Sequence, residues 1–281
     1  NPPEYNGLKI REYSGRSVYL GTGLETIRAR ALGKKKEPVV VLGNILPDDS
    51  YRKKYIDFFA KQFDIKKPIR VVIDAAGGSV PLFLPDILSH FSSINYTPIF
   101  FDIDGSFRKH SPNPLELRSH TYIQKELQKA HYNFGILFDG DGDRIFFFDE
   151  RGHIIDPQFI FLPLALKMLK KKKGLVFPLP VDTSRVVRKE ITSHGGIVKL
   201  CRRGYVFLQT AMRKSSSPVS VERSGHYFFK KFSYDDSGIF AFLSFAEFVS
   251  KSSLSVSKIV KPYMRFASTG ELNFEIRDKD D

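Results

Sequence analysis

The sequence predicts an α/β protein with two consecutive units, each built on a mixed or parallel sheet. Short apolar and β-branched runs of strand length alternate with longer segments whose apolar residues recur at helical spacing, which indicates helices between parallel strands. This alternation occurs twice along the chain, and 281 residues suit two or more compact units. The content of hydrophobic residues, 42%, is ordinary for a globular protein.

The first unit is expected to alternate helices and strands up to Glu150. Its first helix begins after Asp48-Asp49-Ser50, which is a favourable helix start. The expected elements are helices at 51–63, 81–91 and 122–131, and strands at 69–73, 97–101, 133–138 and 145–148.

The second unit repeats the pattern after Glu150. Gly195-Gly196 marks the end of one of its helices. We expect helices at 157–170, 184–194, 205–214 and 236–250, strands at 174–179, 197–200 and 219–222, a Ser- and Lys-rich linker at 251–261, and a strand at 270–276.

The run Asp-Gly-Asp-Gly-Asp-Arg at 139–144 lies between two of these apolar strands. Three carboxylates in one tight loop would repel each other unless a cation lay among them, and the alternating glycines allow Asp139, Asp141 and Asp143 to converge. Oxygen-only ligands in a small loop favour Mg²⁺. The loop therefore predicts a magnesium site.

Two other interpretations of this loop compete with a magnesium site. In an EF-hand, the three aspartates would take the first, third and fifth positions and Glu150 the twelfth, but the sixth position requires glycine and holds Arg144. Strand-like flanks also disagree with an EF-hand. A solvated acidic turn ranks below metal binding, because such turns seldom combine three aspartates with two glycines.

This loop resembles the metal-binding signature of the α-D-phosphohexomutases, the phosphomannomutase/phosphoglucomutase family. Three further segments resemble the family in the same order. Residues 1–9 resemble the end of its active-site serine loop, residues 104–116 a segment of its second domain, and Glu222-Arg223-Ser224-Gly225-His226 its sugar-specificity loop.

The resemblance implies α/β domains of the phosphohexomutase type, of which the family has four around one cleft. On this basis the chain is truncated at both ends. Residues 1–37 are expected to be a C-terminal remnant of the first domain, 38–150 the second domain with the metal loop, 151–258 the third with the sugar loop, and 259–281 the start of the fourth.

The resemblance also implies roles for the residues of the reaction. Asp139, Asp141 and Asp143 would hold Mg²⁺, and Lys9 would act as general acid/base, a role that it can fill if neighbouring cations lower its pKa. Arg144 would contact the transferred phosphoryl group, because its planar fork suits phosphate oxygens; a structural salt bridge to one of the aspartates is compatible with this role.

Substrate-binding residues are expected in two further loops. Glu222 and Ser224 suit sugar hydroxyls, and His226 a hydroxyl or a phosphate. Arg202 and Arg203 precede a helix, where positive charge favours an anion. A tyrosine follows this loop at 205 where the family usually has histidine, so the role of that one position is open.

The implied activity is transfer of a phosphoryl group between O1 and O6 of glucose or mannose phosphate, through a phosphoserine and a 1,6-bisphosphate intermediate. In the family this serine lies just before the position of Asn1. We therefore expect no turnover from these 281 residues alone. The alternative is a fragment that binds Mg²⁺ and sugar phosphate without chemistry.

The net charge of +13 raises the question of nucleic acid as a partner. The lysine runs of the protein lie at 34–36, 170–173 and 230–231. They are scattered and belong to no recognisable DNA- or RNA-binding module, so a specific nucleic-acid partner is not expected. The longest apolar stretch, 159–166, is too short to span a membrane. A single cysteine, Cys201, favours a cytoplasmic location.

Overall fold

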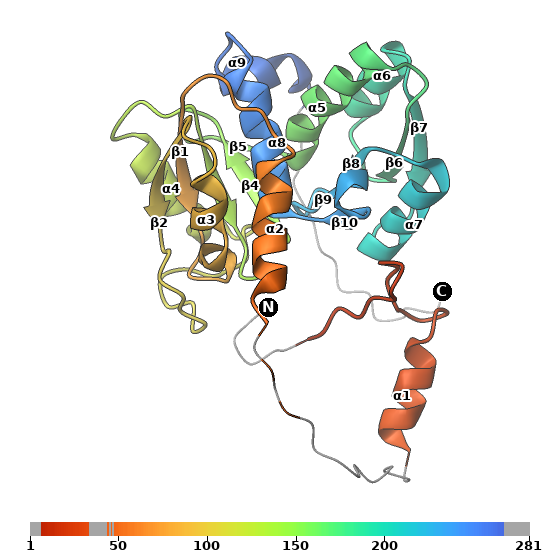
Figure 1. The fold of residues 1–281 in the computed structure, drawn as a ribbon. Helices are drawn as coiled ribbons and strands as arrows, with labels where there is room; N and C mark the ends of the chain where they lie inside the picture. Colours follow the sequence, from red (N-terminus) through yellow and green to blue (C-terminus); the bar gives the residue numbers. More distant parts are fainter. Residues whose placement is uncertain (1–6, 34–43, 45, 47, 267–281) are drawn as a thin grey trace, which may run out of the picture.

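Two α/β units lie side by side in the computed structural model, which describes residues 7–33, 44, 46 and 48–266 (Figure 1). The predicted fold class is confirmed. Residues 1–6 and the predicted strand at 270–276 lie outside the described residues.

The first unit contains a five-stranded mixed sheet with the strand order β2-β1-β3-β4-β5. The central strand β1 pairs in parallel with β2 and β3, whereas β3–β4 and β4–β5 are antiparallel. The strands are β1 (Ile69–Asp74), β2 (Ile94–Ile99), β3 (Phe134–Phe138), β4 (Ile145–Phe148) and β5 (Ile154–Ile155). All residues of β3 and β4 are buried, which explains their continuous apolar sequence.

Short helices accompany this sheet. They are α2 (Ser50–Ala60), η1 (Val80–Leu82), α3 (Leu84–Leu88), η2 (Leu117–His120) and α4 (Thr121–Leu127). The preceding helix α1 (Leu24–Leu32) has no buried residue. It lies apart from both units, at the lower right of Figure 1.

The second unit holds two smaller sheets. Strands β6 (Val176–Pro180) and β7 (Ile197–Cys201) pair in parallel, and β8 (Val219–Val221), β9 (Tyr227–Phe229) and β10 (Asp235–Asp236) form an antiparallel sheet. The helices are α5 (Pro157–Lys171), α6 (Arg185–Ser193), α7 (Tyr205–Ser215), α8 (Gly238–Ser250) and α9 (Val256–Val260), with η3 (Lys230–Phe232) and η4 (Lys261–Tyr263).

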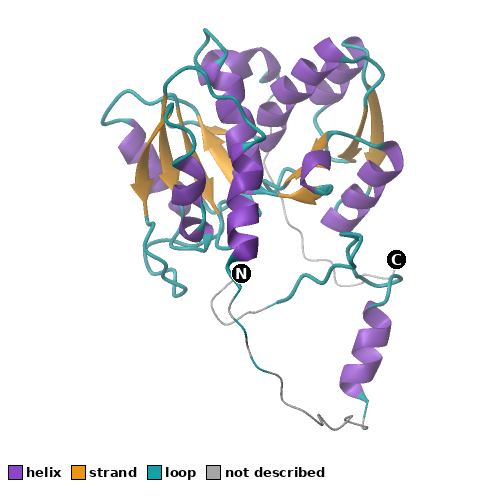
Figure 2. Ribbon diagram, in the orientation of Figure 1, coloured by secondary structure: helices purple, strands orange, loops and turns teal. Residues whose placement is uncertain are grey.

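Helix α8 joins the two units through a common core. It runs between the two groups of strands and packs against β1, β4 and β9 (Figure 2). The ring of Phe245 lies 5.5 Å from that of Phe134 and 5.1 Å from that of Phe147, measured between centroids. One hydrophobic cluster therefore includes residues of both units.

Several predicted elements require correction. The helix expected at 81–91 is a 3₁₀ turn, η1, followed by the short helix α3, which ends at Leu88. The strand expected at 97–101 lies earlier, at Ile94–Ile99, where it pairs with β1. The expected linker at 251–261 contains α9, because Val256, Ile259 and Val260 are buried on one face of it. The helix expected from residue 236 begins at Gly238, since the side chain of Ser237 caps it.

None of the helices in the described part of the chain combines the length and the apolar character that a bilayer crossing requires.

Candidate functional site

The metal loop, residues 139–144, closes the antiparallel hairpin of β3 and β4. Asp139, Asp141 and Asp143 each offer an oxygen, and these atoms lie within 4.8 Å of one another. Strands rather than helices flank the loop, so the rejection of an EF-hand is confirmed. Gly142 has φ +75°, and a Cβ there would lie 2.5 Å from a methyl group of Val80. Glycine is therefore required for the turn that brings the carboxylates together.

Asp139 is the buried member of this group. Its side chain accepts hydrogen bonds from Arg144 Nε at 2.7 Å and from the backbone N–H groups of Gly142 at 3.0 Å and Arg144 at 3.2 Å. Burial, together with the charge of Asp143, raises the pKa of Asp139 to about 7. The structural salt bridge considered for Arg144 is thus present.

Lys9 reaches the metal loop from the beginning of the described chain. Its ammonium group donates to Asp143 and lies 3.9 Å from Asp236 Oδ2. Burial lowers the pKa of Lys9, but the charges of Asp236 and Asp143 raise it further, so that the net shift is upward. In these surroundings the neighbours that act on Lys9 are carboxylates, so that a lowering of its pKa by cations remains a prediction.

The predicted sugar loop, residues 222–226, closes the hairpin of β8 and β9. His226 Nδ1 lies 2.9 Å from Ser224 Oγ and 3.6 Å from Glu222 Oε2, while His226 Nε2 lies 3.5 Å from Asp143 Oδ1. Although burial opposes protonation, Asp143, Asp236 and Glu222 raise the pKa of His226. The histidine therefore links the sugar loop to the metal loop.

Backbone contacts hold these two loops together. Arg144 and His226 form an antiparallel β-bridge, and the N–H of Ile145 donates to the carbonyl of Gly225 at 3.1 Å. Gly225 has φ +94°, and a Cβ there would lie 2.6 Å from the ring of Phe146. This close approach requires glycine in the sugar loop.

Asp236 is a member of the site that the sequence analysis missed. Its Oδ2 is buried without a hydrogen-bond partner in the described chain and lies 3.8 Å from His226 Nε2. Burial raises the pKa of Asp236 to about 6. The sequence contains one signal of this residue, the acidic pair Asp235-Asp236 directly before the helix-capping Ser237. The sequence analysis instead placed residue 236 at the start of the helix expected at 236–250.

The two arginines predicted to bind substrate lie at the exposed edge of the site. Arg202 covers the ring of Phe207 at 4.8 Å, and Arg203 Nε lies 3.7 Å from Asp182. In the described chain neither forms an ion pair with the carboxylates of the metal loop. Their loop is nevertheless tied to the sugar loop, because the N–H of Gly204 donates to a carboxylate oxygen of Glu222 at 2.8 Å.

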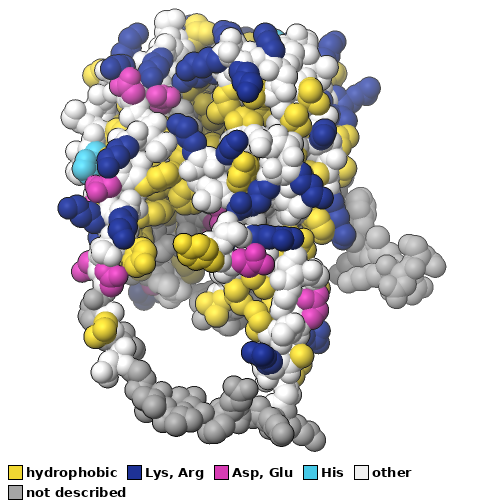
Figure 3. Space-filling model, turned by 45° about the vertical axis from the view of Figure 1, so that its right-hand side comes forward, with side chains coloured by type: hydrophobic (Ala, Val, Ile, Leu, Met, Phe, Trp, Pro, Cys, Tyr) yellow, Lys and Arg dark blue, Asp and Glu magenta, His cyan; other side chains and the backbone are white. Residues whose placement is uncertain are grey.

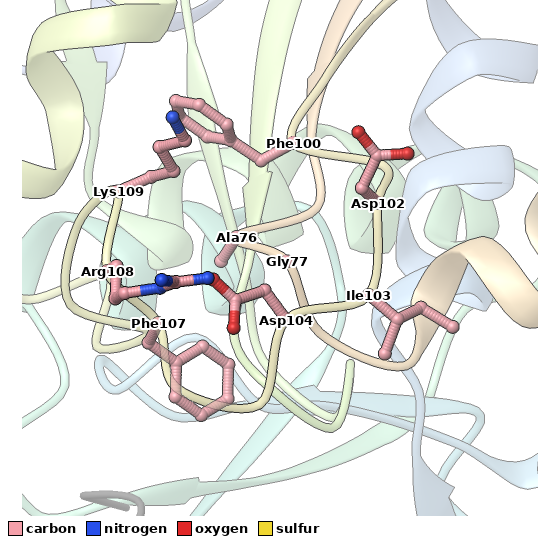
Figure 4. A pocket seen from close by; sticks show the side chains of 9 residues that line it. All are labelled: Ala76, Gly77, Phe100, Asp102, Ile103, Asp104, Phe107, Arg108 and Lys109. Carbon is pink, nitrogen blue, oxygen red and sulfur yellow. The ribbon is translucent and has the colours of Figure 1, made fainter.

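A hollow of about 300 Å³ is lined by residues of two segments, 76–77 and 100–109 (Figure 4). Three residues of its wall have left-handed backbone conformations, Ala76 with φ 52°, Phe100 with φ 51° and Phe107 with φ 49°. The ring of Phe107 lies within 3.1 Å of the position that a Cβ on Gly140 would take. One residue of this wall, Phe107, therefore packs against Gly140 of the metal loop.

The segment that forms this wall includes Asp104, Ser106 and His110, which belong to residues 104–116, the segment that resembles part of the family's second domain. The carboxylate of Asp104 accepts from the N–H of Ser106 at 3.1 Å. His110 Nε2 lies 3.3 Å from both carboxylate oxygens of the buried Asp74. These contacts tie the segment to its own turn and to the end of β1.

Both α/β units match sequence models of one family. Residues 53–152 match phosphoglucomutase/phosphomannomutase α/β/α domain II, and residues 156–266 match domain III. The chain belongs to the phosphohexomutase family. The predicted resemblance is thereby confirmed.

Relatives of this phosphohexomutase chain align along nearly its whole length. A protein named phosphohexose mutases from Xanthomonas campestris pv. campestris is 31% identical over 99% of the chain and 62% of its own length. A phosphomannomutase of Vibrio cholerae serotype O1 is 30% identical over 99% of the chain and 61% of its own length. The chain thus spans about three fifths of these relatives.

The same fold occurs among solved structures. A putative phosphomannomutase from Thermus thermophilus superposes with a TM-score of 0.82, covering 94% of this chain and 60% of its own, at 20% sequence identity. This likeness concerns the fold alone.

Proposed function

We propose that this chain contributes the metal-binding and sugar-binding parts of a phosphohexomutase, which moves a phosphoryl group between O1 and O6 of a hexose phosphate. The observation that carries the proposal is the meeting of Asp139, Asp141 and Asp143 with Lys9 and His226 where the two family-matched units join. Among the described residues, this junction gathers acids, a base and a cationic side chain within reach of one ligand.

The donor set of the metal loop fits Mg²⁺. Three carboxylates present only oxygen, and their mutual repulsion contributes to the raised pKa of Asp139, a repulsion that a cation relieves. When bound, Mg²⁺ would stabilise the negative charge of a phosphoryl group in transfer. Asp139, Asp141 and Asp143 are the residues that would hold it.

The surrounding side chains suit complementary tasks. Lys9 and His226 are placed to hold or release a proton at a sugar hydroxyl, because the carboxylates of Asp143 and Asp236 raise the pKa of both and favour their protonated forms. Arg144 would contact the phosphoryl group with the N–H groups that Asp139 leaves available. Glu222 and Ser224 would bind vicinal hydroxyls of glucose or mannose phosphate, and Arg202 and Arg203 would attract the distant phosphate.

The phosphoserine step, the 1,6-bisphosphate intermediate and the inactivity of these 281 residues alone remain predictions. A binding fragment without turnover is the alternative, and a coupled mutase assay on the 281-residue chain separates the two. A cytoplasmic location likewise remains a prediction from the single cysteine.

Calorimetry with glucose 1,6-bisphosphate tests the binding part of the proposal. We expect binding with Mg²⁺, and its loss in EDTA. Ser224→Ala should weaken it roughly tenfold, because one sugar hydrogen bond is lost. Ser193→Ala, which removes an exposed hydroxyl of α6, is the matched control. Binding that persists in EDTA, ignores Ser224→Ala and disappears at moderate salt would reduce the site to general attraction by the net charge.

A further inference from the structure

A long groove lies between α5 and α8, and it shares no residue with the site described above. Helix α5 contributes one face, with Leu164, Lys167, Met168 and Lys171 at successive turns, and α8 contributes Phe240, Ser244 and Glu247 in the same way. Phe63 closes one side, and Phe229 at the end of β9 closes another. The hollow measures about 660 Å³.

The floor of this groove is apolar. Leu164, Phe229 and Phe240 are at least 95% buried, and the part of each that faces the groove adds carbon surface to it. Phe63 is half-buried, and its ring meets that of Phe240 edge-on at 4.9 Å. Hollows of roughly 300–1,000 Å³ with apolar and aromatic walls are typical of small-molecule sites.

The rim of the groove is cationic. It carries Lys167, Lys171, Lys230 and Lys231 beside a single acid, Glu247. Glu247 is already neutralised, since it accepts from Lys167 at 3.1 Å and from Lys251 at 2.9 Å.

The other three rim lysines have no such partner. Within the described residues, Lys171, Lys230 and Lys231 are exposed and form no salt bridge. Lys and Arg side chains surround hydrophobic surface on the face that Figure 3 turns toward the reader. Unpaired positive charge therefore stands directly beside an apolar hollow.

We propose that this groove binds a single-chain anionic amphiphile, a free fatty acid. Its alkyl chain would lie along the apolar floor, where it is removed from water, and its carboxylate would meet the unpaired lysines of the rim. The half-enclosed shape and the volume suit one small molecule. An acidic amphipathic peptide would satisfy the same charges, but a hollow of about 660 Å³ lies within the range of small-molecule sites, so the peptide is treated as an outcome of the test.

The methionines of the chain supply a direct readout. There are three in the sequence, of which Met168 lines the groove, Met212 is fully buried in α7, and Met264 is 54% exposed after η4. The experiment is NMR of the chain with ¹³C-labelled methionine methyl groups, titrated with dodecanoate below its micelle concentration. We expect a saturable shift of the Met168 resonance and no shift of the other two.

Two control ligands separate the contribution of the alkyl chain from that of the carboxylate. Butanoate, which carries the charge without the long chain, and dodecanol, which carries the chain without the charge, should both bind much more weakly than dodecanoate. The double variant Lys230→Gln/Lys231→Gln should weaken dodecanoate roughly tenfold, whereas Lys170→Gln/Lys172→Gln, on lysines that do not line the groove, should change it less than about twofold.

Several outcomes would overturn the proposal. Equal shifts at all three methionines would mean nonspecific, detergent-like association. Dodecanol binding as tightly as dodecanoate, with no effect of the rim variant, would mean an apolar patch without anion recognition. A saturable Met168 shift with an acidic amphipathic peptide, but none with dodecanoate, would identify a protein-docking surface instead.

Discussion

The metal loop and the sugar loop meet at one site but are held in different ways. The metal loop closes a hairpin whose strands are both fully buried in a five-stranded sheet. The sugar loop closes a hairpin of two three-residue strands in a smaller sheet. Its position also depends on the other unit, through the β-bridge to Arg144 and the hydrogen bond from Ile145 to Gly225.

This difference predicts which of the two loops loses its geometry first when the packing between the units is weakened. The buried strands of its own sheet fix both ends of the metal loop, which also receives contacts from the second unit. The short strands of the sugar loop leave its position more dependent on the docking of the two units. Helix α8 maintains that docking, because its aromatic face packs against β1 and β4 while its first turn contacts the metal loop through the hydrogen bond from Gly238 to Gly142.

Phe245→Ala should have the largest effect, because it removes the ring that joins the units. The side chain is fully buried, and we expect a loss of about 3–5 kcal/mol in the free energy of unfolding. Urea denaturation followed by circular dichroism measures it. Phe266→Ala, at a residue that is 74% exposed, is the control and should change little. A small loss for Phe245→Ala would mean that the two units are docked by other contacts.

Alanine at the two loop glycines compares the loops directly. Gly225→Ala should cost about 2–4 kcal/mol, since it combines a positive φ with a clash against the ring of Phe146. Gly142→Ala shares the positive φ but should cost less, because its Cβ clashes with one methyl group of Val80, whereas the Cβ at Gly225 meets two ring atoms of Phe146 and the carbonyl of Ile145. The control is Gly105→Ala, where a Cβ meets no atom within 4 Å. If Gly142→Ala lost more stability than Gly225→Ala, the metal loop rather than the sugar loop would be the one that tolerates change less.

Asp141→Asn tests the metal loop without disturbing the fold. Asp141 is exposed, so its substitution should leave stability within about 0.5 kcal/mol of the natural chain. Removing one of three carboxylates should weaken Mg²⁺ binding at least roughly tenfold, measured by calorimetry. Asp57→Asn, on α2, should leave Mg²⁺ affinity as it was. Unchanged affinity in Asp141→Asn would remove this residue from the ligand set.

The pair of His110 and Asp74 should give a smaller, pH-dependent effect. Burial lowers the pKa of His110, but the hydrogen bond and charge of Asp74 raise it further, so that the folded-state value lies above 6.5. The pair therefore adds stability that is fully present below pH 6.5 and is lost as the pH rises through the folded-state pKa.

Unfolding by urea across this pH range measures the effect. His110→Asn should remove this pH-dependent loss of stability, while His131→Asn, at an exposed histidine without an ion pair in the described chain, should retain it. A profile that is flat in the unsubstituted chain would contradict the assignment.

The metal loop could be predicted from the sequence because the residues that form it are neighbours in the chain. Alternating aspartates and glycines between two apolar runs require a tight hairpin, and the hairpin brings the carboxylates together. The sequence analysis missed Asp236, whose importance arises from neighbours distant in the chain, Lys9 and His226. The linker that proved to be α9 was misjudged for the same reason, because its serines obscured three apolar residues that become buried only in the assembled core.

The sequence by itself determined the alternation of strands and helices, the family, and the residues that converge in each loop, because these depend on short-range pattern and stereochemistry. The tertiary structure decided which groups face one another: Lys9 surrounded by carboxylates, His226 bridging the two loops, and lysines gathered around an apolar groove. Proton affinities and ligand surfaces arise from distances and burial, and packing sets both only when the units come together.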